Sequence, residues 1–103
     1  MDKNKPPQNQ LNVDLPEEIA SGIYSNLAII THSNAEFIVD FLNALPGMPK
    51  AKVKSRVILT PSHAKRLYKA LRENIAKFEQ VHGEIREGEP EAFPINMGPA
   101  GMA

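Results

Sequence analysis

The sequence predicts an α+β domain, in which a small antiparallel sheet of three or four strands is covered on one face by a long C-terminal helix and both ends are disordered. Three observations predict this class. Apolar and polar residues alternate in several short segments, as in half-buried strands. Turn-forming residues separate these segments. Between residues 61 and 82, apolar residues recur every three to four positions instead, which is typical of an amphipathic helix.

The composition divides the chain into three parts. Residues 1–10 are rich in lysine, asparagine, glutamine and proline, and they cannot bury enough apolar surface to order themselves. Residues 86–103 contain three prolines and three glycines, which predicts a second disordered segment. Residues 11–85 therefore form the single domain, and a domain of this size is marginal without oligomerisation.

The strands are expected at three places in the domain. Residues 23–31 and 36–45 are the first two, and 53–59 is the third, where β-branched residues alternate with basic ones. Residues 11–15 also alternate, and they favour a short fourth strand at the sheet edge because Pro16 prevents further pairing.

The helix has a start signal and a stop signal. Thr60 is suited to the N-cap, and Pro61 suits the first helical position, where no N–H is needed. Gly83 suits the left-handed conformation just past the last residue. The apolar stripe, which must be buried, consists of Ala64, Leu67, Tyr68, Leu71, Ile75, Phe78 and His82.

The strand register follows from the positions of the two turns. If the hairpins are centred on Ser33 and near Met48, then Leu27, Val39 and Val57 lie in one row. The face that carries this row is wholly apolar. It is therefore the expected bed for the helix stripe.

The second sheet face is also too apolar to be left in water. One row of it consists of Ala28, Ile38 and Ile58, and the next is a structural polar row of Asn26, Asp40 and Arg56. Because one helix covers only one side of a sheet, the second face is expected to meet another copy of the chain. The sequence therefore predicts a homodimer through the second sheet face, with Asp40 and Arg56 as a charge pair.

Charge is distributed unevenly, although the formal net charge is zero. Nine of the twelve basic residues lie within residues 50–77, together with the single acid Glu73. A segment of this kind suits an anionic partner such as nucleic acid, or an acidic tail that folds back on it. The helical part of this segment carries an anion-binding face of Lys65, Arg66, Lys69, Arg72 and Lys77.

Motifs for catalysis and metal binding are weak. Residues 62–65 match the S-x-x-K pattern, but the companion motifs of serine–lysine enzymes are missing, and a serine in the first turn is ordinary capping chemistry. His32, His63 and His82 do not share a zinc spacing, and the chain has no cysteine. We therefore predict no catalytic, cofactor-binding or metal-binding residues, and no enzyme activity.

No apolar segment of the sequence is long enough for a membrane span, and residues 1–10 lack the apolar core of a signal peptide. These observations predict a cytoplasmic protein that does not bind membranes.

Several of these residues carry a family resemblance. Asn26, Asp40 with Phe41, the junction Ser55-Arg56-Val57-Ile58-Leu59-Thr60-Pro61, and Gly83 resemble an uncharacterised prokaryotic family, the domain of unknown function numbered three-four-six-seven. The resemblance covers about residues 12–85. It implies a small strand-rich domain closed by a long helix, and no activity.

Two function classes remain. The first is a non-enzymatic, small dimeric module that interacts with other proteins. The second is a nucleic-acid-binding protein that uses the basic strand–helix segment 50–77.

Overall fold

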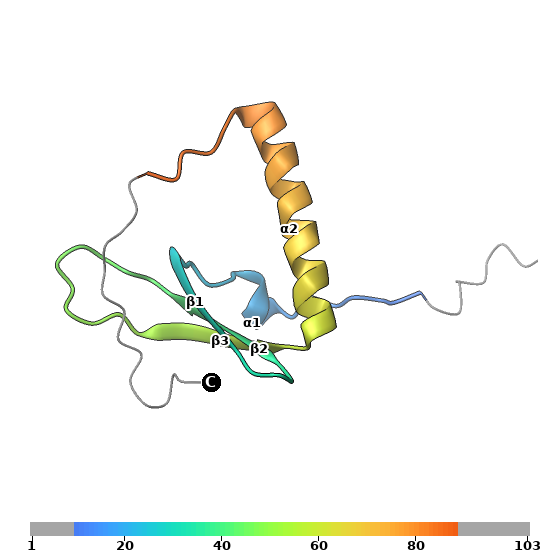
Figure 1. Ribbon diagram of the computed structural model, residues 1–103, viewed down its shortest axis with the longest axis horizontal. Coiled ribbons are helices and arrows are strands. Elements are labelled where there is room, and N and C mark those ends of the chain that lie inside the picture. Colours follow the sequence, from blue (N-terminus) through green and yellow to red (C-terminus); the bar gives the residue numbers. More distant parts are fainter. Residues whose placement is uncertain (1–9, 89–103) are drawn as a thin grey trace, which may run out of the picture.

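The computed structural model describes residues 10–88. The elements are α1 (Glu17–Ala20), β1 (Leu27–His32), β2 (Phe37–Leu42), β3 (Val53–Leu59) and α2 (Pro61–His82). The three strands form an antiparallel sheet and are followed by the long helix α2 (Figure 1), which confirms the α+β class. The predicted disordered segments 1–10 and 86–103 lie outside the described residues, apart from residue 10 and residues 86–88.

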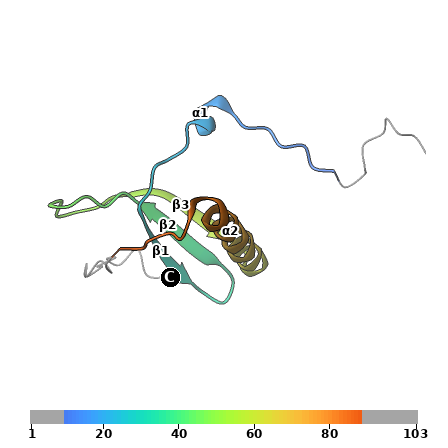
Figure 2. The same cartoon turned by 90° about the horizontal axis from the view of Figure 1, so that it is seen from above.

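The sheet has the order β1-β2-β3, so each strand pairs with its neighbour in the sequence. Residues 11–15 do not form the expected fourth strand. They have no regular structure and lead through Pro16 into the single turn of α1. The backbone of Pro16 is extended, and its carbonyl accepts hydrogen bonds from the N–H groups of Ile19 and Ala20 at 3.0 Å. Figure 2 shows α1 set to one side of the strands.

The register between β2 and β3 follows the prediction over most of its length. Val39 lies opposite Val57, and Asp40 lies opposite Arg56. The pairing shifts by one residue between Phe41 and Leu42, so that Leu42 faces Val53. Such an irregularity adds a residue to one strand and increases its twist.

The register between β1 and β2 differs from the prediction by three residues. Leu27 pairs with Leu42, where we expected Val39. The reason lies in the turn, where the Ser33 hydroxyl accepts hydrogen bonds from Ala35 N at 3.1 Å and Glu36 N at 3.3 Å. These bonds move the centre of the hairpin past Ser33, and an odd shift transfers every β1 side chain to the other face.

We name the two corrected sheet faces after their central residues. The Val39 face consists of Ala28, Ile30, His32, Phe37, Val39, Phe41, Ser55, Val57 and Leu59. The Asp40 face consists of Leu27, Ile29, Thr31, Ile38, Asp40, Leu42, Val53, Arg56 and Ile58. Both faces are largely apolar, as expected, but the predicted row of Ala28, Ile38 and Ile58 is wrong because Thr31 takes the place of Ala28.

The bounds of α2 match the predicted helix. Thr60 is the N-cap, and its hydroxyl accepts a hydrogen bond from His63 N at 3.3 Å. Gly83 has φ of 89°, a conformation that favours glycine, and its N–H donates to the Glu79 carbonyl at 2.9 Å. The start and the stop of the helix were therefore both encoded locally.

The position of α2 is the main departure from the prediction. The helix leaves the end of β3 and stands away from the sheet (Figure 1), and no α2 residue is buried. Leu71 and Phe78, which were expected against the sheet, are 57% and 50% exposed. Within residues 10–88, only Asp40 and Leu42 are buried.

The connection between β3 and α2 explains why the helix does not fold back. Thr60 alone separates the two elements, and it is extended, with φ of −67° and ψ of 153°. Strand-to-helix loops in α/β units usually have about 2–6 residues. Because Pro61 also fixes φ of the first helical residue, this junction sets the direction of α2.

Candidate functional site

Asp40 and Arg56 form a bidentate ion pair at the centre of the Asp40 face. Arg56 Nε donates to Asp40 Oδ1 at 2.6 Å, and Nη2 donates to Oδ2 at 2.8 Å. The Asp40 side chain is 1% exposed, whereas that of Arg56 is 42% exposed. The carboxylate is thus covered by neighbouring side chains and by the guanidinium itself, while the arginine reaches water.

The pair holds Asp40 in its ionised form. The hydrogen bonds from Arg56, together with its charge, lower the pKa of Asp40 below the ordinary value of 3.8, against burial, which acts in the opposite direction. A general acid or base works best when its pKa lies near the operating pH. Asp40 is therefore suited to fixing strand geometry and poorly suited to moving protons near neutral pH.

This pKa shift predicts a pH dependence of stability. Because the pKa of Asp40 is lower in the folded state, the pair stabilises the fold fully above the unfolded value of about 3.8, and this contribution disappears as the pH falls through the folded-state pKa. As the pH is lowered below about 4, the urea midpoint of the wild type should fall more steeply than that of Asp40→Asn. Parallel curves for the two proteins would contradict the assignment.

Asn26 does not join this pair, so the predicted polar row is wrong at that position. The three-residue register shift places Ile29 opposite Asp40. Asn26 instead binds the backbone of Ala44, the second residue after β2, through both ends of its amide: Nδ2 donates to the Ala44 carbonyl at 2.8 Å, and Oδ1 accepts from Ala44 N at 2.7 Å.

The residue before Asn26 contributes to the same connection, which sequence reasoning missed. The Ser25 hydroxyl lies 2.8 Å from the Leu42 carbonyl and 3.0 Å from that of Leu27. Serine and asparagine compete readily for backbone groups, so a Ser-Asn pair directly before an apolar strand was the available signal. Ser25 and Asn26 together close the open end of the β1–β2 hairpin.

The basic segment occupies two places in the structure. The predicted anion-binding face extends from the edge of the apolar stripe, at Lys65 and Arg72, to the opposite side of α2, at Arg66, Lys69 and Lys77, and all five residues are exposed. Lys50, Lys52 and Lys54 lie elsewhere, around a hollow of about 400 Å³ that is lined mainly by the loop joining β2 to β3. Asn43 Oδ1, from the same lining, has no hydrogen-bond partner among residues 10–88.

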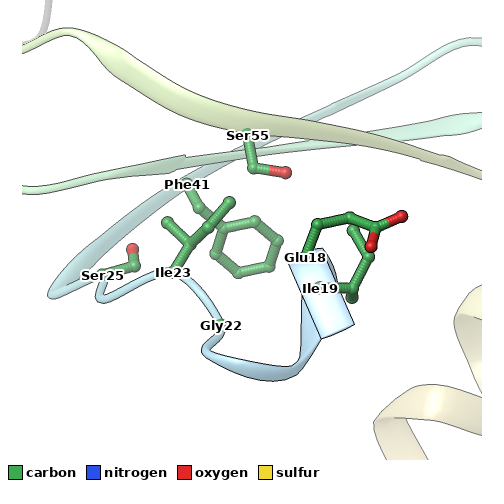
Figure 3. A pocket seen from close by; sticks show the side chains of 7 residues that line it. All are labelled: Glu18, Ile19, Gly22, Ile23, Ser25, Phe41 and Ser55. Carbon is green, nitrogen blue, oxygen red and sulfur yellow. The ribbon is translucent and has the colours of Figure 1, made fainter. Parts of the chain in front are cut away.

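A second hollow, of about 340 Å³, lies between the Val39 face and the α1 segment. Figure 3 shows Phe41 and Ser55 extending from the sheet toward Ile19, Ile23 and Glu18. Gly22 and Ser25 complete its lining. None of these seven residues is a histidine, lysine or cysteine.

The histidines are far apart in the fold. His32 stacks on Phe37 with ring centroids 5.3 Å apart, and His82 packs against Phe78 at 4.7 Å. His63 lies in the first turn of α2 beside Ser62, whose hydroxyl is 3.5 Å from that of Thr60. Across residues 10–88, no three side chains of histidine, cysteine, aspartate or glutamate gather as metal ligands.

None of the helices in the described part of the chain combines the length and the apolar character needed to cross a membrane. The helix α2 has 22 residues, but one side of it is basic.

Comparison with known proteins identifies the family. Neither the curated proteins nor the solved structures include a match to this chain. A family model matches residues 1–87, and it is described as "Protein of unknown function (DUF3467)". This match confirms the resemblance seen in the strand–helix junction, and it covers most of the chain. The protein is therefore a member of the DUF3467 family.

Proposed function

We propose that the protein is a non-enzymatic homodimeric module that interacts with other proteins. The observation that carries this proposal is the exposed apolar side of α2. We call this surface the α2 stripe, and its large members are Leu67, Tyr68, Leu71, Ile75 and Phe78. A stripe of this kind requires a protein surface to cover it.

The size of the α2 stripe supports its role as an interaction surface. Its five side chains are between 40% and 60% exposed, which amounts to roughly 450 Å² if a large side chain presents about 180 Å². Monomeric soluble proteins rarely expose contiguous apolar patches above a few hundred Å², and such patches mark interaction sites. Among residues 10–88 nothing covers the stripe, because the Thr60 junction directs α2 away from the sheet.

A second copy of the chain is the partner we propose first, and its interface differs from the one expected from the sequence. The Asp40 face was assigned to the dimer because α2 was expected to cover the Val39 face. Since α2 covers neither face, the α2 stripe becomes the main candidate. The Asp40 face then remains open, with Ile58 58% exposed, for further protein contacts.

Sedimentation equilibrium of the full-length protein tests the proposal. We expect a dimer at micromolar concentration, because two copies can cover apolar surface that one copy leaves in water. A folded monomer at the highest soluble concentration would contradict it. Circular dichroism of the same samples measures whether the helix is present in each state.

The absence of enzyme activity is part of the same proposal. Asp40 is held ionised by Arg56, and the hollow on the Val39 face contains Glu18 with two serines but no basic partner to activate them. Ser25 is already engaged with two backbone carbonyls.

Nucleic-acid binding is the second candidate, and the separation of charge from the α2 stripe favours it. Arg66, Lys69 and Lys77 of the anion-binding face lie on the outer side of α2, so association through the stripe leaves these cations accessible in both copies. The Arg72 guanidinium lies over the Tyr68 ring, with its Cζ atom 5.9 Å from the ring centroid. The neutral total charge opposes this function.

Salt dependence of binding tests this second candidate. If the protein binds single-stranded nucleic acid through these cations, the log–log slope of affinity against salt should be about −0.7 per phosphate contact. The triple variant Lys65→Gln, Arg66→Gln and Lys69→Gln should flatten the slope without unfolding the helix. The matched variant Lys50→Gln, Lys52→Gln and Lys54→Gln shows whether the loop lysines contribute. Fluorescence anisotropy with labelled oligonucleotides measures the affinity of the wild type and of both triple variants. If the wild type does not bind at low salt, this function is excluded.

A further inference from the structure

The described residues 10–88 carry two apolar surfaces that stay apart within one chain. One is the α2 stripe, and the other is the Val39 face, where Ile30 is 63% and Val57 39% exposed. The single residue between β3 and α2 prevents the helix from lying along its own sheet. A second copy has no such constraint.

We infer that in the homodimer each α2 lies on the Val39 face of the other copy, so that the two chains exchange helices. This inference rests on the homodimer proposed above, and it names the surface that receives the α2 stripe. An exchange of this kind is isologous, because the same two surfaces of each chain are covered in one symmetric step.

The dimensions of the two surfaces agree. From Leu67 to Phe78 the α2 stripe is about 17 Å long at about 1.5 Å per residue. The strands, with six or seven residues, are roughly 20–23 Å long at about 3.3 Å per residue. The stripe therefore fits along the sheet.

Buried area distinguishes this arrangement from a simpler pairing of the two helices. Two stripes packed on each other bury roughly 900 Å² in total, which is below the usual lower limit of about 1,200 Å² for a stable interface. Two stripes packed on two sheet patches of equal size bury roughly 1,800 Å², within the usual range of about 1,200–2,000 Å². Helix exchange is the arrangement that covers the Val39 face as well as the stripe.

Charge and shape on the Val39 face also suit a second α2. The hollow between Phe41 and the α1 segment has room for a large apolar side chain, and Glu18 lies in its lining. The first turn of α1 holds Glu17 and Glu18, and α1 has no basic residue. Successive residues of a helix are rotated by about 100°, which places Lys65 and Arg72 beside the apolar stripe of α2. These cations therefore meet the acidic α1 when the stripe is seated.

The chain contains no cysteine, so single introduced cysteines can test the inference cleanly. One chain carries Val57→Cys on the Val39 face, and a second chain with a different affinity tag carries Leu71→Cys on the α2 stripe. The two are mixed, allowed to exchange partners and treated with a short bismaleimide. Because each chain has one thiol, a product that contains both tags can form only between copies. We expect this doubly tagged product from Val57→Cys with Leu71→Cys.

Two matched pairs provide the controls. Ile58→Cys lies on the adjacent residue of β3 but on the Asp40 face, and Ala76→Cys lies on the outer side of α2. Neither Ile58→Cys with Leu71→Cys nor Val57→Cys with Ala76→Cys should give the product. Ile30→Cys replaces Val57→Cys on the same face if the latter variant does not fold.

The possible results separate this inference from the homodimer itself. Cross-linking through Ile58 in place of Val57 would overturn helix exchange and assign the interface to the Asp40 face. Cross-links only between two copies of Leu71→Cys would overturn it in favour of paired helices. In both cases the homodimer stands. A monomer in sedimentation equilibrium removes the homodimer, and helix exchange with it.

Discussion

Leu71→Glu is expected to convert the proposed dimer into monomers. Leu71 lies in the middle of the α2 stripe and is 57% exposed in the single chain, so the substitution removes apolar contact and places a charge in the proposed interface. We expect a loss of at least about 2–3 kcal/mol of association free energy per copy, which corresponds to roughly a 1,000-fold or greater increase in the dimer dissociation constant when both copies are counted. Sedimentation equilibrium over a range of concentrations measures this constant.

Two controls add the same charge elsewhere. Ala76→Glu lies on the outer side of α2 and should leave the dissociation constant within a few-fold of the wild type. Ile58→Glu adds a charge to an exposed position of the Asp40 face and should also leave a dimer. If Ile58→Glu dissociates the protein and Leu71→Glu does not, the interface is on the Asp40 face and the α2 stripe has another occupant.

The second large effect is expected at the ion pair, and it should be asymmetric. Arg56→Leu leaves the Asp40 carboxylate, which is 1% exposed, without its partner. A buried polar group left unpaired costs about 1–3 kcal/mol, and we expect a loss in this range because the carboxylate is shielded by adjacent side chains rather than by a deep core. Asp40→Leu should cost less, because the Arg56 side chain already reaches water.

The double variant makes the pairing measurable. Asp40→Leu with Arg56→Leu replaces the pair by two apolar side chains among Ile29, Ile38 and Ile58, and it should be more stable than Arg56→Leu alone. Urea unfolding at one fixed protein concentration gives all four free energies of unfolding. Lys54→Leu, at an exposed position of the same strand, is the control for loss of a cation. Strictly additive losses would contradict direct coupling between the two residues.

Local features of the fold could be predicted from the sequence because nearby residues determine them. Thr60, Pro61 and Gly83 fix the two ends of α2, and the loop of residues 43–52, whose centre lies near Met48, gives the pairing of Asp40 with Arg56. The predicted register of the first hairpin was wrong by three residues. Its turn depends on a side chain, because the Ser33 hydroxyl accepts hydrogen bonds from two backbone N–H groups. Composition and spacing did not reveal which turn residue would do so.

Whether α2 packs on the sheet of its own chain could not be predicted from the sequence, for a different reason. The pattern of Leu67, Leu71 and Phe78 shows that one side of α2 needs a partner surface, but the pattern is the same whether that surface belongs to its own chain or to another. The deciding feature was the length of the connection at Thr60. The same limit applied to the candidate site, because the position of Asn26 against Ala44 follows from the register of the first hairpin.

The small number of buried side chains has a consequence for how the protein reaches its native state. With only Asp40 and Leu42 buried among residues 10–88, a lone chain has little to gain from folding, so in the proposed homodimer folding and association become a single bimolecular event. The melting temperature then rises with protein concentration, and the abundance of the protein in the cell sets the fraction that is folded. A newly synthesised chain stays open to proteolysis until it meets another copy, so low expression limits its own accumulation.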